Sequence, residues 1–230
     1  MHISDGVLSA PTLIIGGLAA LAGVGYGLRK LEPEKMMSVA ILTAAFFVIT
    51  LVHLPGDLHL VLNGLLGVML GWAALPAVAV ALLLQSILFQ FGGLTSLGVN
   101  ICIAGYPAVL CGMIFRRFLQ GHSQNLSQYP VQGERQNQSQ VQSQTQNKNR
   151  NQAQSQGRGH YLAAFLCGTS AIVLSALTAS LFLISSGPLF WGTATALVLA
   201  HIPVMLIEGA VTVFIYSRVI GIAPQLFQQP

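Results

Sequence analysis

The chain has 230 residues, of which 53% are hydrophobic and only 7% are charged. A soluble domain carries about 25% charged residues, so this composition excludes an ordinary soluble enzyme or binding domain and indicates an integral membrane protein. The formal net charge is only +4, and its distribution along the chain is more informative than its size. The length suits six or seven spanning helices of about 20 residues each.

Seven hydrophobic segments predict an all-α fold, a polytopic membrane bundle of about seven transmembrane helices. These segments cover about 7–28, 36–54, 58–72, 77–91, 99–115, 161–185 and 190–219. The third and fourth are short for a hydrocarbon core of roughly 30 Å, so a re-entrant hairpin is the alternative for this pair. We expect the last helix to bend at Pro203.

The composition changes abruptly between 120 and 160, where Gln, Asn and Ser predominate. This stretch has no hydrophobic period and cannot bury a core, so it is expected to be a disordered linker. The chain therefore divides into a first group of helices over 1–119, the linker over 120–160, and two further helices over 161–230.

The positions of the Lys and Arg residues predict the orientation in the cell membrane. When the loop after the first helix is placed in the cytoplasm, alternation over seven helices puts all ten of these residues on the cytoplasmic side. The linker and the C-terminus are then cytoplasmic, and the N-terminus lies outside. Asp57, His59 and the Gly-rich loop over 92–98 share the outer face with it.

No cleavable signal peptide is expected, because residues 1–28 contain no Lys or Arg for a basic n-region. The first helix is therefore expected to remain, with His2 beside a free amino terminus. The Met1 amine, the His2 amide nitrogen and the His2 imidazole could then form two fused chelate rings on one metal ion. Three nitrogens in one plane favour Ni(II) or Cu(II) and can accept Co(II).

A fourth ligand must come from elsewhere in the chain. His59 and His53 both lie at the outer face, and His201 lies deeper in the last helix. Taken alone, a histidine at the membrane interface is more often a polar anchor than a ligand. His59 is the favoured candidate among them, with His53 behind it.

Several polar residues could support such a site. Asp5 and Asp57 could orient an imidazole or cap the helices that follow them. Asn63 and Asn100 are expected to form hydrogen bonds between helices close to the outer ends. Glu208 follows His201 by two helical turns. We favour a structural role, in which the two residues bond to each other or to neighbouring helices, over a proton relay or a second metal site.

Several stretches resemble the CbiM/NikM family, the substrate-capture components of energy-coupling factor transporters for cobalt and nickel. They are Met1-His2-Ile3-Ser4-Asp5-Gly6, His59-Leu60-Val61-Leu62-Asn63-Gly64-Leu65, Phe91 to Asn100, and His201-Ile202-Pro203 through Glu208-Gly209. The resemblance implies a planar site for Co²⁺ or Ni²⁺ built from Met1, His2 and, as the fourth ligand, His59. It gives no role to His53, and it implies no resident cofactor.

The resemblance also implies partners within the lipid bilayer. They are a transmembrane coupling subunit, two ATP-binding-cassette ATPases and a small accessory membrane subunit. The chain has no phosphate-binding loop of its own, so it is expected to be a non-catalytic subunit of the transporter, with no nucleic-acid partner. The alternative function is a stand-alone secondary divalent-metal transporter or channel.

Overall fold

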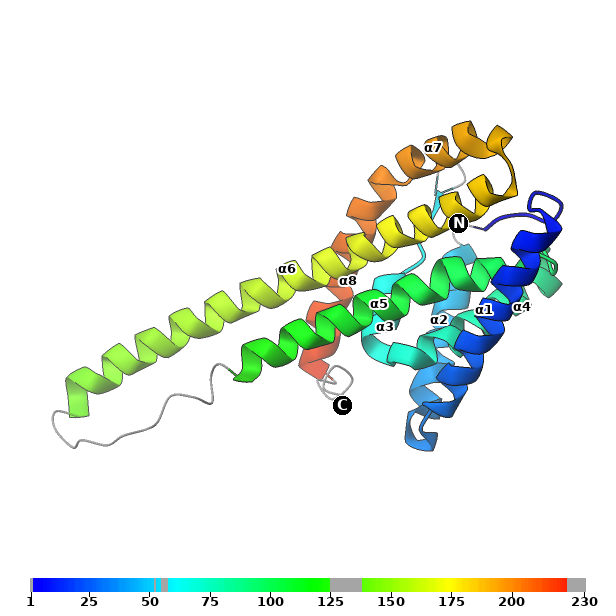
Figure 1. Cartoon of the computed structure of the whole chain (residues 1–230). Coiled ribbons are helices and arrows are strands. Elements are labelled where there is room, and N and C mark those ends of the chain that lie inside the picture. The colour runs from blue at the N-terminus through cyan, green and yellow to red at the C-terminus, as the bar shows by residue number, and fades with distance from the viewer. Residues whose placement is uncertain (1, 52, 55–57, 125–137, 223–230) are drawn as a thin grey trace.

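The computed structural model describes residues 2–51, 53–54, 58–124 and 138–222. The helical elements are α1 (Ala10–Arg29), η1 (Pro33–Lys35), α2 (Met36–Leu51), α3 (Asn63–Leu70), η2 (Gly71–Ala73), α4 (Ala74–Phe89), α5 (Leu97–Gln124), α6 (Gln138–Ser186), η3 (Pro188–Phe190), α7 (Trp191–Ala200) and α8 (Ile202–Ile222), as Figure 1 shows. Two short strands, β1 (His53–Leu54) and β2 (Leu58–His59), pair antiparallel between α2 and α3.

Six segments of the described chain are long and apolar enough to cross a membrane. They are Ala10–Arg29, Pro33–Leu51, Asn63–Phe89, Leu97–Arg117, Gly159–Ser186 and Pro188–Val219. The predicted helical membrane bundle is therefore confirmed, and the chain is a multi-pass membrane protein. The third and fourth predicted helices fall together into the segment Asn63–Phe89.

That segment is a helical hairpin, which turns at Gly71. Gly71 has a φ of +57°, a conformation that costs glycine little and other residues more. Gly67 lies against Ala108 and Gly71 against Arg116, so α3 runs parallel to α5. The helix α4 then returns, and a short connection leads from it into α5.

The prediction of a helix from about 58 was wrong at its start, because Leu58 and His59 pair as a strand and α3 begins at Asn63. The eight residues of α3 cover about 12 Å at 1.5 Å per residue, which is less than half of a hydrocarbon core. Seven of the eight are buried. This helix is therefore an internal half-helix that depends on its neighbours.

Glycine allows the central helices to approach closely. A Cβ on Gly67 or Gly112 would overlap the backbone of the facing helix. On the small-residue face of α1, Gly16 and Gly23 make room for the side chains of Val99 and Tyr106, and the backbone of Gly17 lies against Gly98. Packing without side chains in between is typical of helix pairs in lipid.

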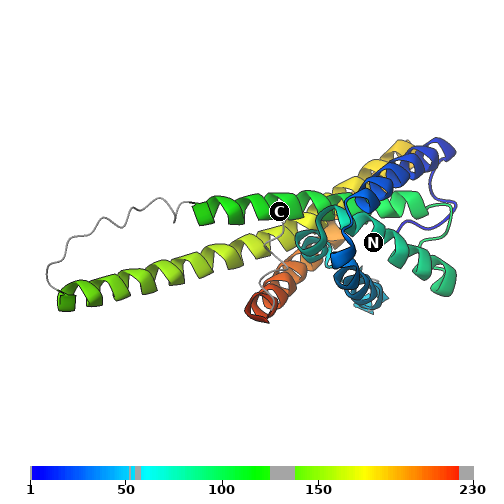
Figure 2. The same cartoon turned by 90° about the horizontal axis from the view of Figure 1, so that it is seen from below.

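The Gln-rich segment carries more helix than we expected. Figures 1 and 2 show α5 and α6 extending side by side beyond the bundle, α5 as far as Gln124 and α6 from Gln138. Gln has a favourable helix propensity, and a membrane helix that is already formed extends without a new nucleation step. Residues 125–137 lie outside the described part, and the division of the chain at 120 and 160 stays a prediction.

The last predicted helix is divided close to the expected bend. The helix α7 ends at Ala200 and α8 begins at Ile202, so Pro203 occupies the first turn of α8. Proline is tolerated there because the amide that it lacks has no partner within the helix. The break therefore falls at His201.

Candidate metal centre at the amino-terminal tip

The residues before α1 fold back onto the bundle. We call residues 2–9 the tip, and in Figure 1 it loops from the start of α1 across the neighbouring helices. Ile3 and Leu8 are 6% and 8% exposed and join a buried cluster with Val99, Ile103 and Leu183. Burial of an aliphatic side chain contributes about 1.5–3 kcal/mol, so two such anchors favour the folded-back tip over a free tail.

Asn100 on α5 holds the tip by its backbone. The Ile3 N–H donates to Asn100 Oδ1 at 2.8 Å, and Asn100 Nδ2 donates to the Ile3 carbonyl at 3.0 Å. Asn100 is 2% exposed, so both bonds lie away from water, where an unpaired polar group is costly. The residue next to His2 is thereby fixed in position.

The Gly-rich connection between α4 and α5 makes room for the tip. A Cβ on Gly92 would lie 3.5 Å from His2 Cβ and 2.9 Å from Asn100 Nδ2. A Cβ on Gly93 would overlap the Asp5 carboxyl group. Both glycines have a positive φ, +79° and +98°. Larger residues would therefore be strained at these positions and would displace the tip.

Asp5 binds the same connection rather than capping α1. Its Oδ1 accepts the Thr95 hydroxyl at 2.5 Å and the Ser96 N–H at 3.0 Å. The hydrogen bond from Thr95 is the main reason that the pKa of the Asp5 carboxyl is lowered from its ordinary value. The residue that precedes α1 is Ser9, so the expected capping role of Asp5 at that helix is wrong.

The segment that carries His59 is fixed by the hairpin of β1 and β2. The Cα of His53 pairs with that of His59, and Leu54 pairs with Leu58. His53 and His59, the two candidate fourth ligands at the outer face, therefore lie directly opposite each other in this hairpin. Asp57 and Met1, which the sequence also proposed, lie outside the described residues.

Glu208 on α8 holds the chain just after His59. Its Oε1 accepts the N–H of Val61 at 2.5 Å and of Leu62 at 2.6 Å. Leu62 precedes α3 with a φ of +52°, so this carboxylate satisfies amides at the start of that half-helix. Glu208 is 1% exposed, and its Oε2 has no hydrogen-bond partner among the described atoms.

His201 and Glu208 do not form a pair in the structure. The Nδ1 of His201 lies 2.7 Å from the Leu197 carbonyl of the preceding turn, whereas Glu208 binds the α3 start. The structural interpretation of both residues is thus supported, but their partners are the backbones of different helices. Asn63 also has a structural contact, since its Nδ2 donates to Ser175 on α6 at 3.0 Å.

Within the described ranges, no three His, Cys, Asp or Glu side chains gather as a metal-binding group. The site expected from the sequence uses two histidines and two main-chain nitrogens, one of them on Met1. It contains only two side chains of these types, so it would not form a group of three. The set Met1, His2 and His59 stays a prediction. The sequence did not reveal that Glu208 anchors the segment that carries His59. This contact joins parts of the chain that lie about 146 residues apart.

The chain is similar in sequence to several known proteins, and the matches cover all of it or only a part. Over 123 residues it is 50% identical to a putative metal transport protein of Haemophilus influenzae, a match that covers 52% of this chain and 60% of the relative. It is 26% identical over 238 residues to a putative fused nickel transport protein NikMN of Archaeoglobus fulgidus, covering 100% of this chain and 68% of the relative. A 38% identical match to a fused nickel transport protein NikMN of Rhodobacter capsulatus covers 44% and 31% of the two chains.

The fold also matches solved structures. A crystal structure of a truncated transition metal transporter superposes with a TM-score of 0.72 over 96% of this chain and 99% of the other, at 22% identity. The family model described as the cobalt uptake substrate-specific transmembrane region, CbiM, matches residues 2–226. The chain therefore belongs to the CbiM family.

Proposed function

We propose that this chain captures Co²⁺ or Ni²⁺ at its outer face and passes it to an ATP-driven importer of the energy-coupling factor type. The observation that carries the proposal is the double hydrogen bond between Asn100 and Ile3. It fixes the backbone beside His2, which a chelating amino terminus requires. A flexible tail would lose much of its binding free energy to ordering.

The proposed ligands are the Met1 amine, the amide and ring nitrogens of His2, and the imidazole of His59. Nitrogen ligands in a plane suit Ni²⁺ and Cu²⁺, and Co²⁺ is compatible with the same set. The relatives named as nickel transport proteins and the family named for cobalt uptake support these two ions. Asp5 and Asn100 support the site by holding the tip, whereas the hydrogen bond of Asn63 goes to Ser175 on α6.

The proposed partners are a transmembrane coupling subunit, two ATP-binding-cassette ATPases and a small accessory membrane subunit. The ATPases would supply the free energy, so this chain would bind the ion without catalysing a reaction. The competing function is a secondary transporter or channel that needs no partner. Liposomes that contain only this chain test it, since uptake of Ni²⁺ or Co²⁺ without ATPases would favour the competitor.

Metal analysis of the purified full chain tests the site. With its native amino terminus the chain is expected to retain one Ni²⁺ or Co²⁺ when the two are offered in competition. One residue added before Met1, or His2→Ala, is expected to abolish retention, whereas His201→Ala is expected to preserve it. Unchanged binding by the extended chain would overturn the amino-terminal site.

His59→Ala and His53→Ala identify the fourth ligand in the same measurement. Their backbones are partners in one hairpin, so each variant controls for the local disturbance that the other causes. Loss of binding only in His59→Ala supports the proposed set. Loss only in His53→Ala would assign that role to the other histidine.

A further inference from the structure

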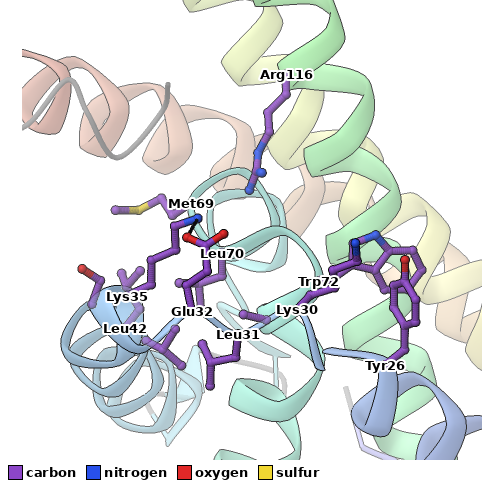
Figure 3. Close-up of a pocket in the computed structure, with 13 residues that line it drawn as sticks. Tyr26, Lys30, Leu31, Glu32, Lys35, Leu42, Met69, Leu70, Trp72 and Arg116 are labelled. Atoms are coloured by element: carbon purple, nitrogen blue, oxygen red, sulfur yellow. Dashed lines mark ion pairs between the residues drawn. The ribbon is translucent and has the colours of Figure 1, made fainter. Parts of the chain in front are cut away.

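A second polar feature lies at the opposite end of the bundle from the tip. The end of α1, η1 and the start of α2 close with η2 and α5 around a cavity of about 290 Å³, drawn in Figure 3. The 20 residues of α1 separate it from the tip by about 30 Å, the thickness of a hydrocarbon core. The cavity therefore lies at the level of lipid headgroups, on the side that the charge pattern predicts to be cytoplasmic.

The walls of the cavity are positively charged. Lys30, Lys35 and Arg116 line it together with Glu32, the single acid among the described lining residues, which gives a net charge of +2. Lys35 Nζ already lies 2.6 Å from Glu32 Oε2, the ion pair that Figure 3 marks with a dashed line. The charge that remains for a ligand is that of Lys30 and Arg116, and it favours an anion.

Arg116 is held rigidly at the wall. Its Nε donates to the Val68 carbonyl at 3.0 Å and its Nη2 to the Gly67 carbonyl at 3.2 Å, at the end of α3. Gly71, which has no side chain, leaves the space in which the guanidinium lies, since a Cβ there would be 2.9 Å from Nη2. These bonds use two of the five N–H donors of arginine. A cation fixed in advance loses little entropy when an oxyanion binds.

The remaining walls fit an amphiphile better than a soluble anion. Tyr26 and Trp72 meet edge to face, with ring centroids 4.6 Å apart, and such residues are enriched at the membrane interface. Val39, Leu42 and Leu70 form an apolar wall beside the cations. A phosphate bonded to acyl chains would use both kinds of surface, whereas inorganic phosphate would use only the charged one.

We propose that this cavity binds the phosphate headgroup of an anionic phospholipid, with Lys30 and Arg116 as its cationic contacts. The lipid would join α1, α2 and α5 at one end of the bundle. Anionic lipids are abundant in the cytoplasmic leaflet, and basic pockets between transmembrane helices are known to recognise them. The proposal is independent of the metal site.

Native mass spectrometry of the delipidated full chain, titrated with phosphatidylglycerol or phosphatidylcholine, provides the test. We expect phosphatidylglycerol to bind preferentially. Lys30→Gln is expected to weaken its binding by about fivefold, which corresponds to about 1 kcal/mol per basic side chain. Glu32→Gln removes the acid from the wall and is expected to strengthen binding. Lys30 is exposed, so its substitution should not disturb the fold.

Arg29→Gln and Arg117→Gln are the matched controls, because each removes one charge beside a lining residue without belonging to the lining. Both are expected to stay within about twofold of the wild type, since solvent and salt screen charges that make no direct contact. Equal losses in Lys30→Gln and Arg29→Gln would overturn the proposal in favour of diffuse surface charge. Displacement of the lipid by inorganic phosphate would instead assign the site to a soluble oxyanion. Equal binding of phosphatidylcholine, which has the same phosphodiester but no net charge, would overturn the preference for an anionic lipid.

Discussion

Asn100 and Ile3 are joined by two hydrogen bonds that pair both main-chain polar groups of the tip residue with one side-chain amide. The geometry resembles one rung of a β-ladder in which a side chain replaces the partner strand. Because Asn100 also contacts Ser96 Oγ at 3.3 Å, the start of α5 and the tip form one connected unit. The position of His2 therefore depends on α5.

Asn100→Ala is expected to weaken Ni²⁺ binding. The substitution leaves the N–H and the carbonyl of Ile3 unpaired in a buried place, at a cost of about 1–3 kcal/mol for each group. Since 1.4 kcal/mol is about tenfold in affinity, we expect a loss of at least about tenfold. Isothermal titration calorimetry with the full chain measures it.

Asn63→Ala is the control for that variant. Asn63 is also a buried asparagine, but it bonds to Ser175 on α6 and does not contact Ile3. The control is expected to lose stability while the metal affinity changes little. An equal loss of affinity in both variants would mean that general destabilisation, and not the hold on the tip, explains the effect.

Gly93→Ala is expected to release the tip. A methyl group there would overlap the Asp5 carboxyl group, and the φ of +98° is unfavourable for alanine. The tip should then become a substrate for an aminopeptidase, which removes residues from an accessible amino terminus. Gly17→Ala is the matched control, because a Cβ added at that position on α1 would have no other atom within 4 Å. Equal resistance of the two variants would contradict this account of the glycines.

The transmembrane helices could be predicted because each requires a long apolar run, and this signal is local in the sequence. The charge pattern likewise predicts an orientation from local composition. The start of α3 could not be found in this way. Leu58 to Leu62 are as hydrophobic as the helix itself. Their strand pairing with β1 and their contact with Glu208 show that they are not helical.

Asp5 shows the same limit at the tip. Its place shortly before a helix fits an N-cap, but its actual donors, Thr95 and Ser96, lie about ninety residues away. The sequence does predict Asn100 as a support, because a polar residue near the outer end of a membrane helix must find a partner. The type of interaction was predictable there, and the identity of the partner, Ile3, was not.

Acid is expected to release the tip through Asp5. Its pKa is lowered in the folded-back tip because Thr95 and Ser96 donate hydrogen bonds to the carboxylate, so the stabilisation is complete above its ordinary pKa of about 3.9. It is lost as the pH falls through the lower value of the docked state. Hydrogen exchange measures the protection of residues 2–9. Asp5→Asn should remove the acid-dependent step, and an identical step in this variant would assign it to another group.

Glu208 is expected to act as an anchor for the segment that carries His59. Glu208→Ala leaves the amides of Val61 and Leu62 buried and unpaired, each at a cost of about 1–3 kcal/mol. Glu208→Gln keeps an acceptor oxygen, so thermal unfolding in detergent should rank the wild type above Gln and Gln above Ala. Ni²⁺ affinity should follow the same order if the anchor positions His59. If Gln restores stability and the affinity still falls as far as in Ala, then the negative charge of Glu208, and not its hydrogen bonds, is what the metal site needs.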